Sequence, residues 1–177
     1  MKIEILDCTI RDGGYLNKWN FSDEQVINCF KAGSESGFDY VELGFRSSKK
    51  IFDDNKYGKW IFCSEEDLRL VFNSVDKASK ISIMVRPENV EIDNFIKSEN
   101  SVIDMIRVVI TDPSYIPKAC KYANRLKYLG YTVGLNPIRI DSYTERDLRN
   151  YFSKISEHKP EIDYFFIADT YGSIDLK

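Results

Sequence analysis

The sequence predicts an α/β fold built on one parallel sheet. Six apolar runs rich in Ile, Val, Phe and Tyr recur along the chain, and most are near-continuous rather than alternating, as in parallel strands covered on both faces. Amphipathic segments with helix-start signals lie between these runs. This alternation implies right-handed crossovers within a single sheet. A length of 177 residues with 43% hydrophobic content suits one domain with its own core.

The expected strands follow the apolar runs in order. They cover residues 3–9, 40–45, 81–85, 105–110, 132–136 and 164–168. The first is followed by the string DCTIRDGGY, which lacks the GxGxxG spacing that opens many doubly wound sheets. A complete (β/α)₈ barrel needs about 250 residues, so a barrel chain of this length would hold its first six strands. The pattern leaves both an open sheet and a partial barrel as alternatives.

Four helices are expected between the strands. Their start signals are Ser22-x-x-Gln25, Ser64-x-x-Asp67, Asp112-Pro113 and Thr144. The third helix is expected to stop at Gly130, since glycine commonly ends helices. Residues 87–101 predict only a weak turn around 92–96.

Composition excludes several classes of partner. The chain has 25 basic and 28 acidic residues, and its net charge of −3 gives no general attraction to nucleic acid or to an anionic membrane. No apolar run approaches the roughly 18 residues that span a bilayer. The four cysteines are Cys8, Cys29, Cys63 and Cys120. They have no CxxC spacing, and no signal segment precedes the first strand, so we expect a reduced, cytoplasmic protein.

Polar residues follow the expected strands, at the edge where parallel α/β folds carry their chemistry. They are Arg11, Asp12, Glu42, Arg46, Arg86, Asp112, Asn136, Asp169 and Thr170. Asp112 directly precedes a helix and is expected to cap it. Arg11 and Asp12 are also compatible with a simple turn, because Asp-Gly is a common turn pair. Glu42 is different, since it lies inside the apolar run YVELGF and needs a buried partner; Arg11 is the expected one.

The strings LDCTIRDGGYLNKWNF, YVELGFRSSKK, GKWIFCSEEDL and YFFIADTYGS carry a family resemblance. With Arg11, Asp12 and Glu42 they resemble the DRE-TIM metallolyases, which include HMG-CoA lyases, isopropylmalate and homocitrate synthases, and 4-hydroxy-2-oxovalerate aldolases. The chain is most similar to aldolase catalytic domain proteins close to the last group. The resemblance favours the barrel over the open sheet. It implies a TIM (β/α)₈-type barrel of which residues 1–177 supply about six βα units as one partial domain.

The resemblance also implies roles for individual residues. Asp12 would be a ligand of Mg²⁺ or Mn²⁺. Arg11 would hydrogen-bond the keto or enolate oxygen of the substrate, and Glu42 would hold Arg11 in place. Asn136, Asp169 and Thr170 would bind substrate at the same mouth. The two glycines after Asp12 would let the backbone approach the substrate closely.

The sequence departs from the family pattern at two places. The aldolases carry a histidine three residues after the metal-binding aspartate, where this chain has Tyr15, so the catalytic base is Tyr15 or another group. The family takes its other protein metal ligands from a His-x-His pair on strand seven, beyond Lys177. The single histidine, His158, lies in a polar stretch on the other side of the barrel and is expected to be solvated. We therefore expect weak metal binding and no aldolase activity from this chain alone.

The long connection over residues 46–63 follows the second strand and is expected to overhang the site. Its basic residues are Arg46, Lys49, Lys50, Lys56 and Lys59, interspersed with Phe52, Tyr57, Trp60 and Phe62. This composition suits an anionic substrate such as a 2-keto acid or a phosphorylated compound, with Arg46 and Lys49 as binding residues. A solvated basic loop held by its aromatics is the alternative. A loop with little to bury would also be mobile without ligand.

These observations lead to one main hypothesis and two rivals. The main hypothesis is a divalent-metal-dependent aldolase or lyase that cleaves or forms a carbon–carbon bond next to the keto group of a 2-keto acid. A Claisen-type acyl-CoA condensing enzyme of the same superfamily would use the same residues. A non-catalytic partial barrel that acts by association is the third reading. Unpaired first and sixth strands would also favour self-association, so we expect a homo-oligomer.

Overall fold

The computed structural model describes residues 3–76, 78–170 and 172. Its strands are β1 (Leu6–Asp7), β2 (Tyr40–Phe45), β3 (Lys80–Val85), β4 (Ile103–Ile110), β5 (Thr132–Pro137) and β6 (Tyr164–Phe165). All neighbouring pairs are parallel, and the strand order is β1-β2-β3-β4-β5-β6. A doubly wound sheet would reverse its strand order at a switch point. The sequential order therefore belongs to a barrel, and the expected partial TIM-type barrel is confirmed.

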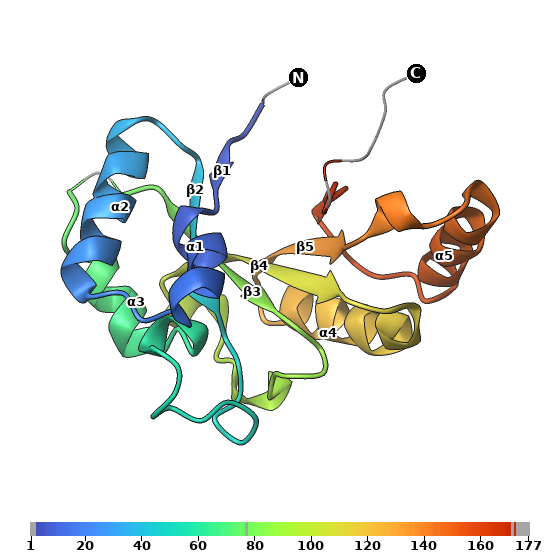
Figure 1. Cartoon of the computed structure of the whole chain (residues 1–177), viewed down its shortest axis with the longest axis horizontal. Coiled ribbons are helices and arrows are strands. Elements are labelled where there is room, and N and C mark those ends of the chain that lie inside the picture. Colours follow the sequence, from blue (N-terminus) through green and yellow to red (C-terminus); the bar gives the residue numbers. More distant parts are fainter. Residues whose placement is uncertain (1–2, 77, 171, 173–177) are drawn as a thin grey trace.

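The helices lie between the strands and pack on the sheet (Figure 1). They are α1 (Thr9–Asn17), α2 (Asp23–Glu35), α3 (Glu65–Phe72), α4 (Ile116–Tyr128) and α5 (Glu145–Glu157). Short 3₁₀ turns are η1 (Lys59–Ile61), η2 (Ile92–Asn94), η3 (Ser98–Asn100), η4 (Pro113–Tyr115) and η5 (Ile140–Ser142). None of the helices in the described ranges has both the length and the apolar character that crossing a bilayer requires.

The sheet curls strongly into a half-barrel. Tyr40 of β2 and Tyr164 of β6 are separated by three strands in the sheet, yet their ring centroids lie 6.4 Å apart. The hydroxyl of Tyr164 also donates a hydrogen bond to Glu4, just before β1. Because a flat sheet would hold these strands far apart, the contacts define a concave inner face. Side chains of alternate strand residues line that face.

The outer face of the sheet forms the main core with the helices. Val26 and Phe30 of α2, Leu68 of α3 and Leu126 of α4 are fully buried. Gly33 of α2 lies against β2, where an added Cβ would come within 2.8 Å of a Val41 methyl group. The helices therefore fix the strands from outside. The concave face is left for polar residues.

Most element starts match the expectation. Ser22 forms the capping box with Gln25, and Ser64 and Thr144 cap α3 and α5 through their side chains. Asp112 caps the 3₁₀ turn η4 rather than α4 itself, because its carboxylate accepts from the Ser114 amide at 2.8 Å. The crossover from β3 to β4 contains only 3₁₀ turns, in keeping with its weak pattern. All four cysteines are free thiols.

The ends of the sheet differ from the expectation. The strand expected over 3–9 is only Leu6–Asp7, and the strand expected over 164–168 is only Tyr164–Phe165. The string after β1 is the helix α1 and not a loop. The reason is tertiary, because the Trp19 indole packs on Gly14 and its Nε1–H donates to the Arg11 carbonyl at 3.1 Å. Gly14 thus makes room for Trp19, where a backbone approach to substrate was expected.

Candidate functional site

The site is organised around one buried carboxylate on the concave face. Glu42 of β2 has no solvent exposure, and α1 places Arg11 beside it at the end of β1. The Arg11 Nε–H donates to Glu42 Oε1 at 2.7 Å. The expected Arg11–Glu42 pair is therefore present with the geometry of a charge-assisted hydrogen bond.

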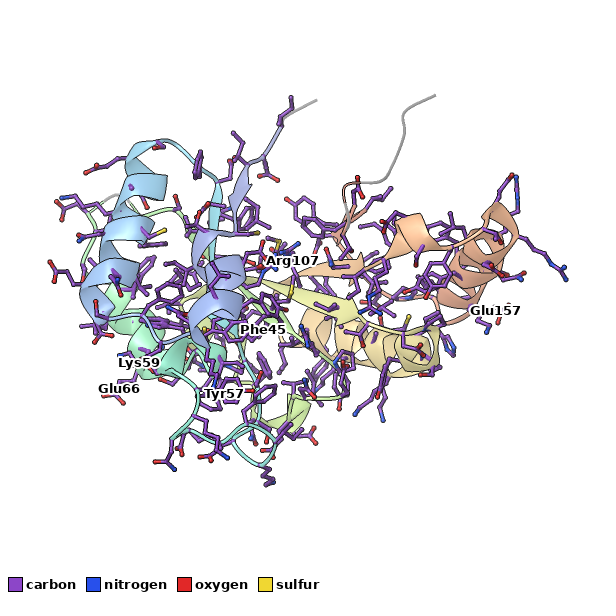
Figure 2. All side chains as sticks on the ribbon, viewed as in Figure 1. Phe45, Tyr57, Lys59, Glu66, Arg107 and Glu157 are labelled. Carbon is purple, nitrogen blue, oxygen red and sulfur yellow. The ribbon has the colours of Figure 1, made fainter. Side chains whose placement is uncertain are left out.

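A second arginine, Arg107, forms a bidentate pair with the same carboxylate. Arg107 of β4 donates from Nε to Glu42 Oε2 at 2.7 Å and from NH2 to Oε1 at 2.6 Å. This two-point pairing fixes both the plane and the position of the carboxylate. Figure 2 shows Arg107 in the middle of the molecule, among the strands. One negative charge is thus shared by the buried Arg107 and the partly buried Arg11, and these three groups together carry a net charge of +1 before the exposed Asp12, which also pairs with Arg11, is counted.

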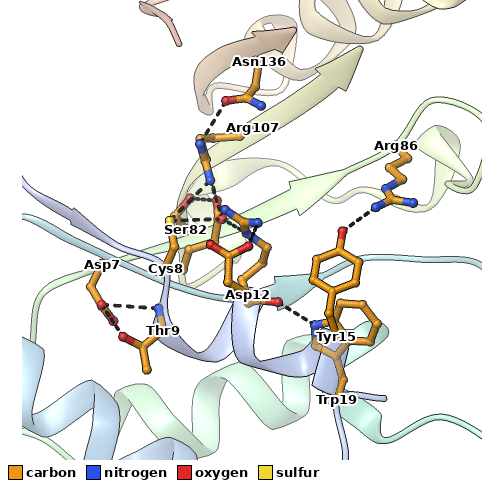
Figure 3. Close-up of polar contacts among 12 residues, drawn as sticks. Asp7, Cys8, Thr9, Asp12, Tyr15, Trp19, Ser82, Arg86, Arg107 and Asn136 are labelled. Atoms are coloured by element: carbon orange, nitrogen blue, oxygen red, sulfur yellow. Dashed lines mark hydrogen bonds and ion pairs between the residues drawn. The ribbon is translucent and has the colours of Figure 1, made fainter. Parts of the chain in front are cut away.

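Neighbouring side chains complete the cluster (Figure 3). Ser82 of β3 donates to Glu42 Oε2 at 3.1 Å, and Arg107 NH1 donates to Asn136 Oδ1 of β5 at 3.1 Å. The Arg107 guanidinium also lies 4.7 Å from the ring centroid of Phe166. Four adjacent strands, β2 to β5, therefore contribute to one hydrogen-bonded network. Buried networks of this kind are rigid when every member is satisfied.

Gly134 of β5 makes this arrangement sterically possible. A Cβ at Gly134 would lie 2.5 Å from Phe166 Cε2 and 3.3 Å from Arg107 Cγ. Any larger residue would push the Phe166 ring or the Arg107 side chain out of place. The glycine in the run TVGLNP is thus a packing requirement of the cluster.

The electrostatics of the cluster follow from burial and pairing. Burial alone would raise the pKa of Glu42, but the two guanidinium groups override it and hold that pKa below its ordinary value. Burial opposes the charge of Arg11 and Arg107, yet Glu42 raises the pKa of both above the usual value. Burial, followed by the Glu42 charge, raises the pKa of Cys8 to about 11. The ion cluster is charged and Cys8 is a neutral thiol at physiological pH.

A cavity of about 380 Å³ opens directly above the cluster at the carboxyl ends of the strands. Arg11 and Arg107 contribute to its floor. Other lining residues are Asp12, Tyr15, Met84, Arg86, Val109, Asn136, Ile138, Ala168, Asp169 and Thr170. We call this space the strand-end cavity. Six of the predicted site residues line it: Arg11, Asp12, Tyr15, Asn136, Asp169 and Thr170. A seventh, Glu42, lies beneath them and accepts a hydrogen bond from Arg11.

Helix α1 supplies one wall of the strand-end cavity. Asp12 is exposed and pairs with the Arg11 NH1 group. Tyr15 lies one turn further along, and its hydroxyl accepts a hydrogen bond from Arg86 at the end of β3. The Tyr15 ring packs edge-on against Trp19, with centroids 4.7 Å apart. The wall is therefore built from side chains that already have fixed partners.

The structure places Arg46 and Lys49 outside the strand-end cavity. Arg46 donates from Nε and NH2 to the Cys63 carbonyl and pairs with Glu65 at 3.1 Å, while Lys49 pairs with Asp54 at 3.0 Å. Both line a separate hollow that is also lined by Glu65 and Glu91. The two were predicted to bind substrate at the strand ends, and in this geometry they do not reach that site.

The loop over residues 46–63 is also more buried than its composition suggested. Trp60, Ile61 and Phe62 are core residues, and the Trp60 indole donates to the Phe21 carbonyl at 3.2 Å. Lys59 bridges Asp23 of α2 and Asp67 of α3 at 2.6 and 2.7 Å. The expectation of a loop with little to bury is wrong, and its contacts match the alternative of a basic loop held by its aromatics.

The described residues do not fit a complete divalent-metal site. Asp12 offers one carboxylate, which Arg11 already pairs, and no group of three His, Cys, Asp or Glu side chains within the described ranges is arranged to hold a metal ion. His158 is exposed at the end of α5, as expected. Divalent cations of the Mg²⁺ type require several oxygen ligands.

Two site residues were missed by the sequence reasoning. Arg107 lies inside the run IDMIRVVI and was counted as part of a strand, although a charge in an apolar run was the very signal that identified Glu42. Arg86 was noted at a strand end but given no role. Its Nε is buried and has no hydrogen-bond partner in the described part of the chain.

Solved structures confirm the fold. The N-terminal domain of a proposed aldolase from Bacteroides vulgatus matches 93% of this chain with a TM-score of 0.66 and 24% identity. HMG-CoA lyases from Brucella melitensis and Pseudomonas aeruginosa match 92% and 96% of it, with TM-scores of 0.60 and 0.53 and identities of 14% and 16%. The chain spans 62%, 60% and 68% of these three structures, respectively. No protein-family model and no curated protein matches the sequence significantly. The expected likeness to the aldolase and HMG-CoA lyase group holds at the level of the fold.

Proposed function

We propose that the strand-end cavity binds a 2-keto acid and that the chain serves a carbon–carbon lyase, which breaks or forms the bond next to the keto group. The main support is the pair of guanidinium groups, Arg11 and Arg107, that Glu42 holds at the cavity floor. Fixed positive charge in a largely desolvated site favours anions and developing negative charge. The lyase-like fold of the neighbours supports the same reaction class.

The chemistry requires stabilisation of an enolate. When a 4-hydroxy-2-keto acid is cleaved, the bond between C3 and C4 breaks and its electron pair is shared between C3 and the keto oxygen. The C4 hydroxyl gives its proton to a base as C4 becomes the carbonyl carbon of an aldehyde, and protonation of C3 yields the other product, a shorter 2-keto acid. Negative charge thus builds up on the keto oxygen in the transition state. A preorganised donor at that oxygen lowers the barrier.

Arg11 is the residue we assign to the keto oxygen. Its Nε is held by Glu42 and one terminal nitrogen is held by Asp12, so the guanidinium plane is fixed before substrate arrives. Positioned donors of this kind need no reorganisation during the reaction. Arg107 lies deeper, in a two-point pair, and is a positioning residue that orients Glu42 and adds to the positive potential.

The remaining residues supply donors for the rest of the substrate. The oxygen of Asn136 accepts from Arg107, which leaves its amide nitrogen as a donor toward the cavity. Thr170 accepts from the Arg139 amide at 2.8 Å and retains its own hydroxyl hydrogen. Asp169 lines the same side and suits the substrate hydroxyl. We assign proton transfer to Tyr15, whose oxygen is occupied by Arg86 and whose hydroxyl lines the cavity.

Ligand titration tests this proposal on the chain itself. Oxalate is a planar dianion that mimics the enolate of pyruvate, so calorimetry should give at least about tenfold tighter binding for oxalate than for pyruvate. Arg11→Lys keeps the positive charge but loses the planar set of guanidinium N–H donors, and it should weaken oxalate binding by about tenfold or more. Arg149→Lys on the exposed surface of α5 is the matched control and should change nothing. Equal binding of the two ligands, or full oxalate affinity in Arg11→Lys, would refute the enolate assignment.

A further inference from the structure

A second cavity of about 270 Å³ lies beside the strand-end cavity, between α1 and the loop over residues 46–63. We call it the aromatic cavity because five of its ten lining residues carry aromatic rings. These rings are Tyr15, Trp19, Phe45, Phe52 and Tyr57. Figure 2 labels Phe45 and Tyr57, which come from β2 and from the loop after it. The site described above makes no use of this space.

The rings form two edge-to-face groups, one of Tyr15, Trp19 and Phe45 and one of Phe52 and Tyr57. Trp19 and Phe45 have centroids 5.5 Å apart, Tyr15 and Phe45 6.3 Å, and Phe52 and Tyr57 5.1 Å, all near perpendicular. Trp19 and Phe45 are buried, and Tyr57 is half-buried. Such walls present both faces and edges of rings to an occupant. Aromatic rings pack favourably in this geometry.

Tyr15 and Arg86 line both cavities and form the boundary between them. Arg86 donates to the Tyr15 hydroxyl, and its guanidinium lies 5.1 Å from the Phe45 ring centroid (Figure 3 shows the Arg86–Tyr15 contact). The two spaces therefore meet across a pair of side chains rather than across backbone. A ligand that occupies both cavities would have to pass this pair.

The polar groups at the boundary indicate where a ligand passes. The buried Arg86 Nε has no hydrogen-bond partner among the described residues, although an unpaired buried donor costs stability. Guanidinium groups also stack on aromatic faces. A planar ring beside Arg86 would gain that stacking, and a polar atom next to the ring would satisfy the free donor.

We propose that the aromatic cavity binds an aromatic substituent of the substrate, so that the preferred ligand is an aryl-substituted 2-keto acid rather than pyruvate or a short aliphatic homologue. This inference deepens the proposed function and rests on it for the keto acid part. The volume is sufficient, since an apolar cavity of about 150 Å³ accommodates benzene. The acid and keto groups lie at Arg11, and the ring lies between Tyr57 and Trp19.

Three probes distinguish the contribution of the ring to binding from that of the keto acid group. They are pyruvate, phenylpyruvate and phenylacetate, the last of which carries the ring and a carboxylate but no ketone. Their affinities for the chain are measured by calorimetry. Burying one phenyl ring should make phenylpyruvate bind about tenfold to a hundredfold more tightly than pyruvate. Phenylacetate should bind more weakly than phenylpyruvate, because it lacks the group that faces Arg11.

Substitutions in the wall of the aromatic cavity test whether the preference for phenylpyruvate arises there. Tyr57→Ala removes one ring and should reduce the preference for phenylpyruvate by about tenfold without changing pyruvate affinity. Ser47→Phe fills the cavity from its edge and should have the same effect, which guards against a folding defect in either variant. Tyr128→Ala removes an exposed ring on α4 and is the matched control. It should leave all three affinities unchanged.

The outcomes distinguish the two proposals. Equal affinity for pyruvate and phenylpyruvate would overturn the aromatic site and leave the keto acid site intact. Phenylacetate binding as tightly as phenylpyruvate, with no binding of pyruvate, would support the aromatic site and overturn the keto acid assignment. A preference for phenylpyruvate that survives both Tyr57→Ala and Ser47→Phe would place the ring elsewhere and refute the inference.

Discussion

Replacing Glu42 by Gln tests how far one carboxylate holds the centre of the molecule together. The side chain keeps its size, but its charge is lost and an amide N–H₂ group replaces an oxygen that accepts from Arg11 or Arg107. Arg107 then remains buried without a counter-charge, and Arg11 keeps only its pair with the exposed Asp12. The change therefore removes attraction and adds a clash between hydrogen-bond donors.

The magnitude follows from the contacts. At an effective dielectric of about 20, each charge pair contributes roughly 4 kcal/mol of attraction at about 4 Å, and the burial of the carboxylate offsets much of the sum. Removing one partner of a buried ion cluster typically costs about 3–5 kcal/mol, because the other charge is left unpaired. We expect Glu42→Gln to lower the free energy of unfolding by that amount. This is a large share of the stability of a typical domain.

Urea unfolding followed by circular dichroism measures the effect. Glu145→Gln is the matched control, since it breaks the exposed Glu145–Arg149 pair on α5 and should cost no more than about 0.5 kcal/mol. If Glu42→Gln lowers the free energy of unfolding by no more than Glu145→Gln does, the cluster is not the organising element of the concave face.

The same variant has a defined pH dependence. The folded-state pKa of Glu42 lies below its ordinary value of 4.5, so the folded protein binds fewer protons there than the unfolded chain. The stability that Glu42 contributes is complete above the unfolded-state pKa and is lost as pH falls toward the folded-state pKa. The difference between wild type and Glu42→Gln should therefore be constant near neutral pH and shrink below about pH 4.5. A difference that grows in acid would contradict the assigned direction.

Three other predictions concern the elements that support the site. Gly14→Ala should lower the free energy of unfolding by about 1–3 kcal/mol, because the new Cβ would lie 2.1 Å from Trp19 Nε1, whereas Gly13→Ala in the same helix should change it by less than about 1 kcal/mol. Ser22→Ala should cost about 1 kcal/mol through loss of the capping box, measured in the same urea titration. Cys8 in the folded protein should react with iodoacetamide at pH 8 very slowly, since a pKa of about 11 leaves roughly a thousandth of it as thiolate, and rapid modification would contradict its burial beside Glu42.

Sequence reasoning recovered the features that depend on local pattern. Near-continuous apolar runs identified the strands, and capping residues such as Ser22 located the helix starts. Glu42 was found because an acid inside an apolar run requires a buried cation, and the structure supplies one in Arg11. These signals are physical constraints on a single segment. They can be read without knowledge of its neighbours.

The features that were missed depend on contacts between distant segments. Two glycines after Asp12 favour a turn, and only the packing of Trp19 on Gly14 explains why α1 forms there. Arg46 was assigned to substrate because its partner Glu65 could not be known from the loop sequence. Arg107 carried the same signal as Glu42, a charge inside an apolar run, but its strand could not show that Glu42 would face it across the sheet.

The central claim is that Arg11 and Arg107 form the floor of a keto acid site, and side-chain NMR tests it most directly. The Nε–H signals of the arginines are followed in ¹⁵N-labelled protein while pyruvate is added, with assignments from single Arg→Lys variants. The account predicts saturable shifts for Arg11, weaker ones for Arg107 and none for the exposed Arg149. Unchanged Arg11 signals, or the same shifts with acetate in place of pyruvate, would show that the cavity does not recognise a keto acid and would contradict the account.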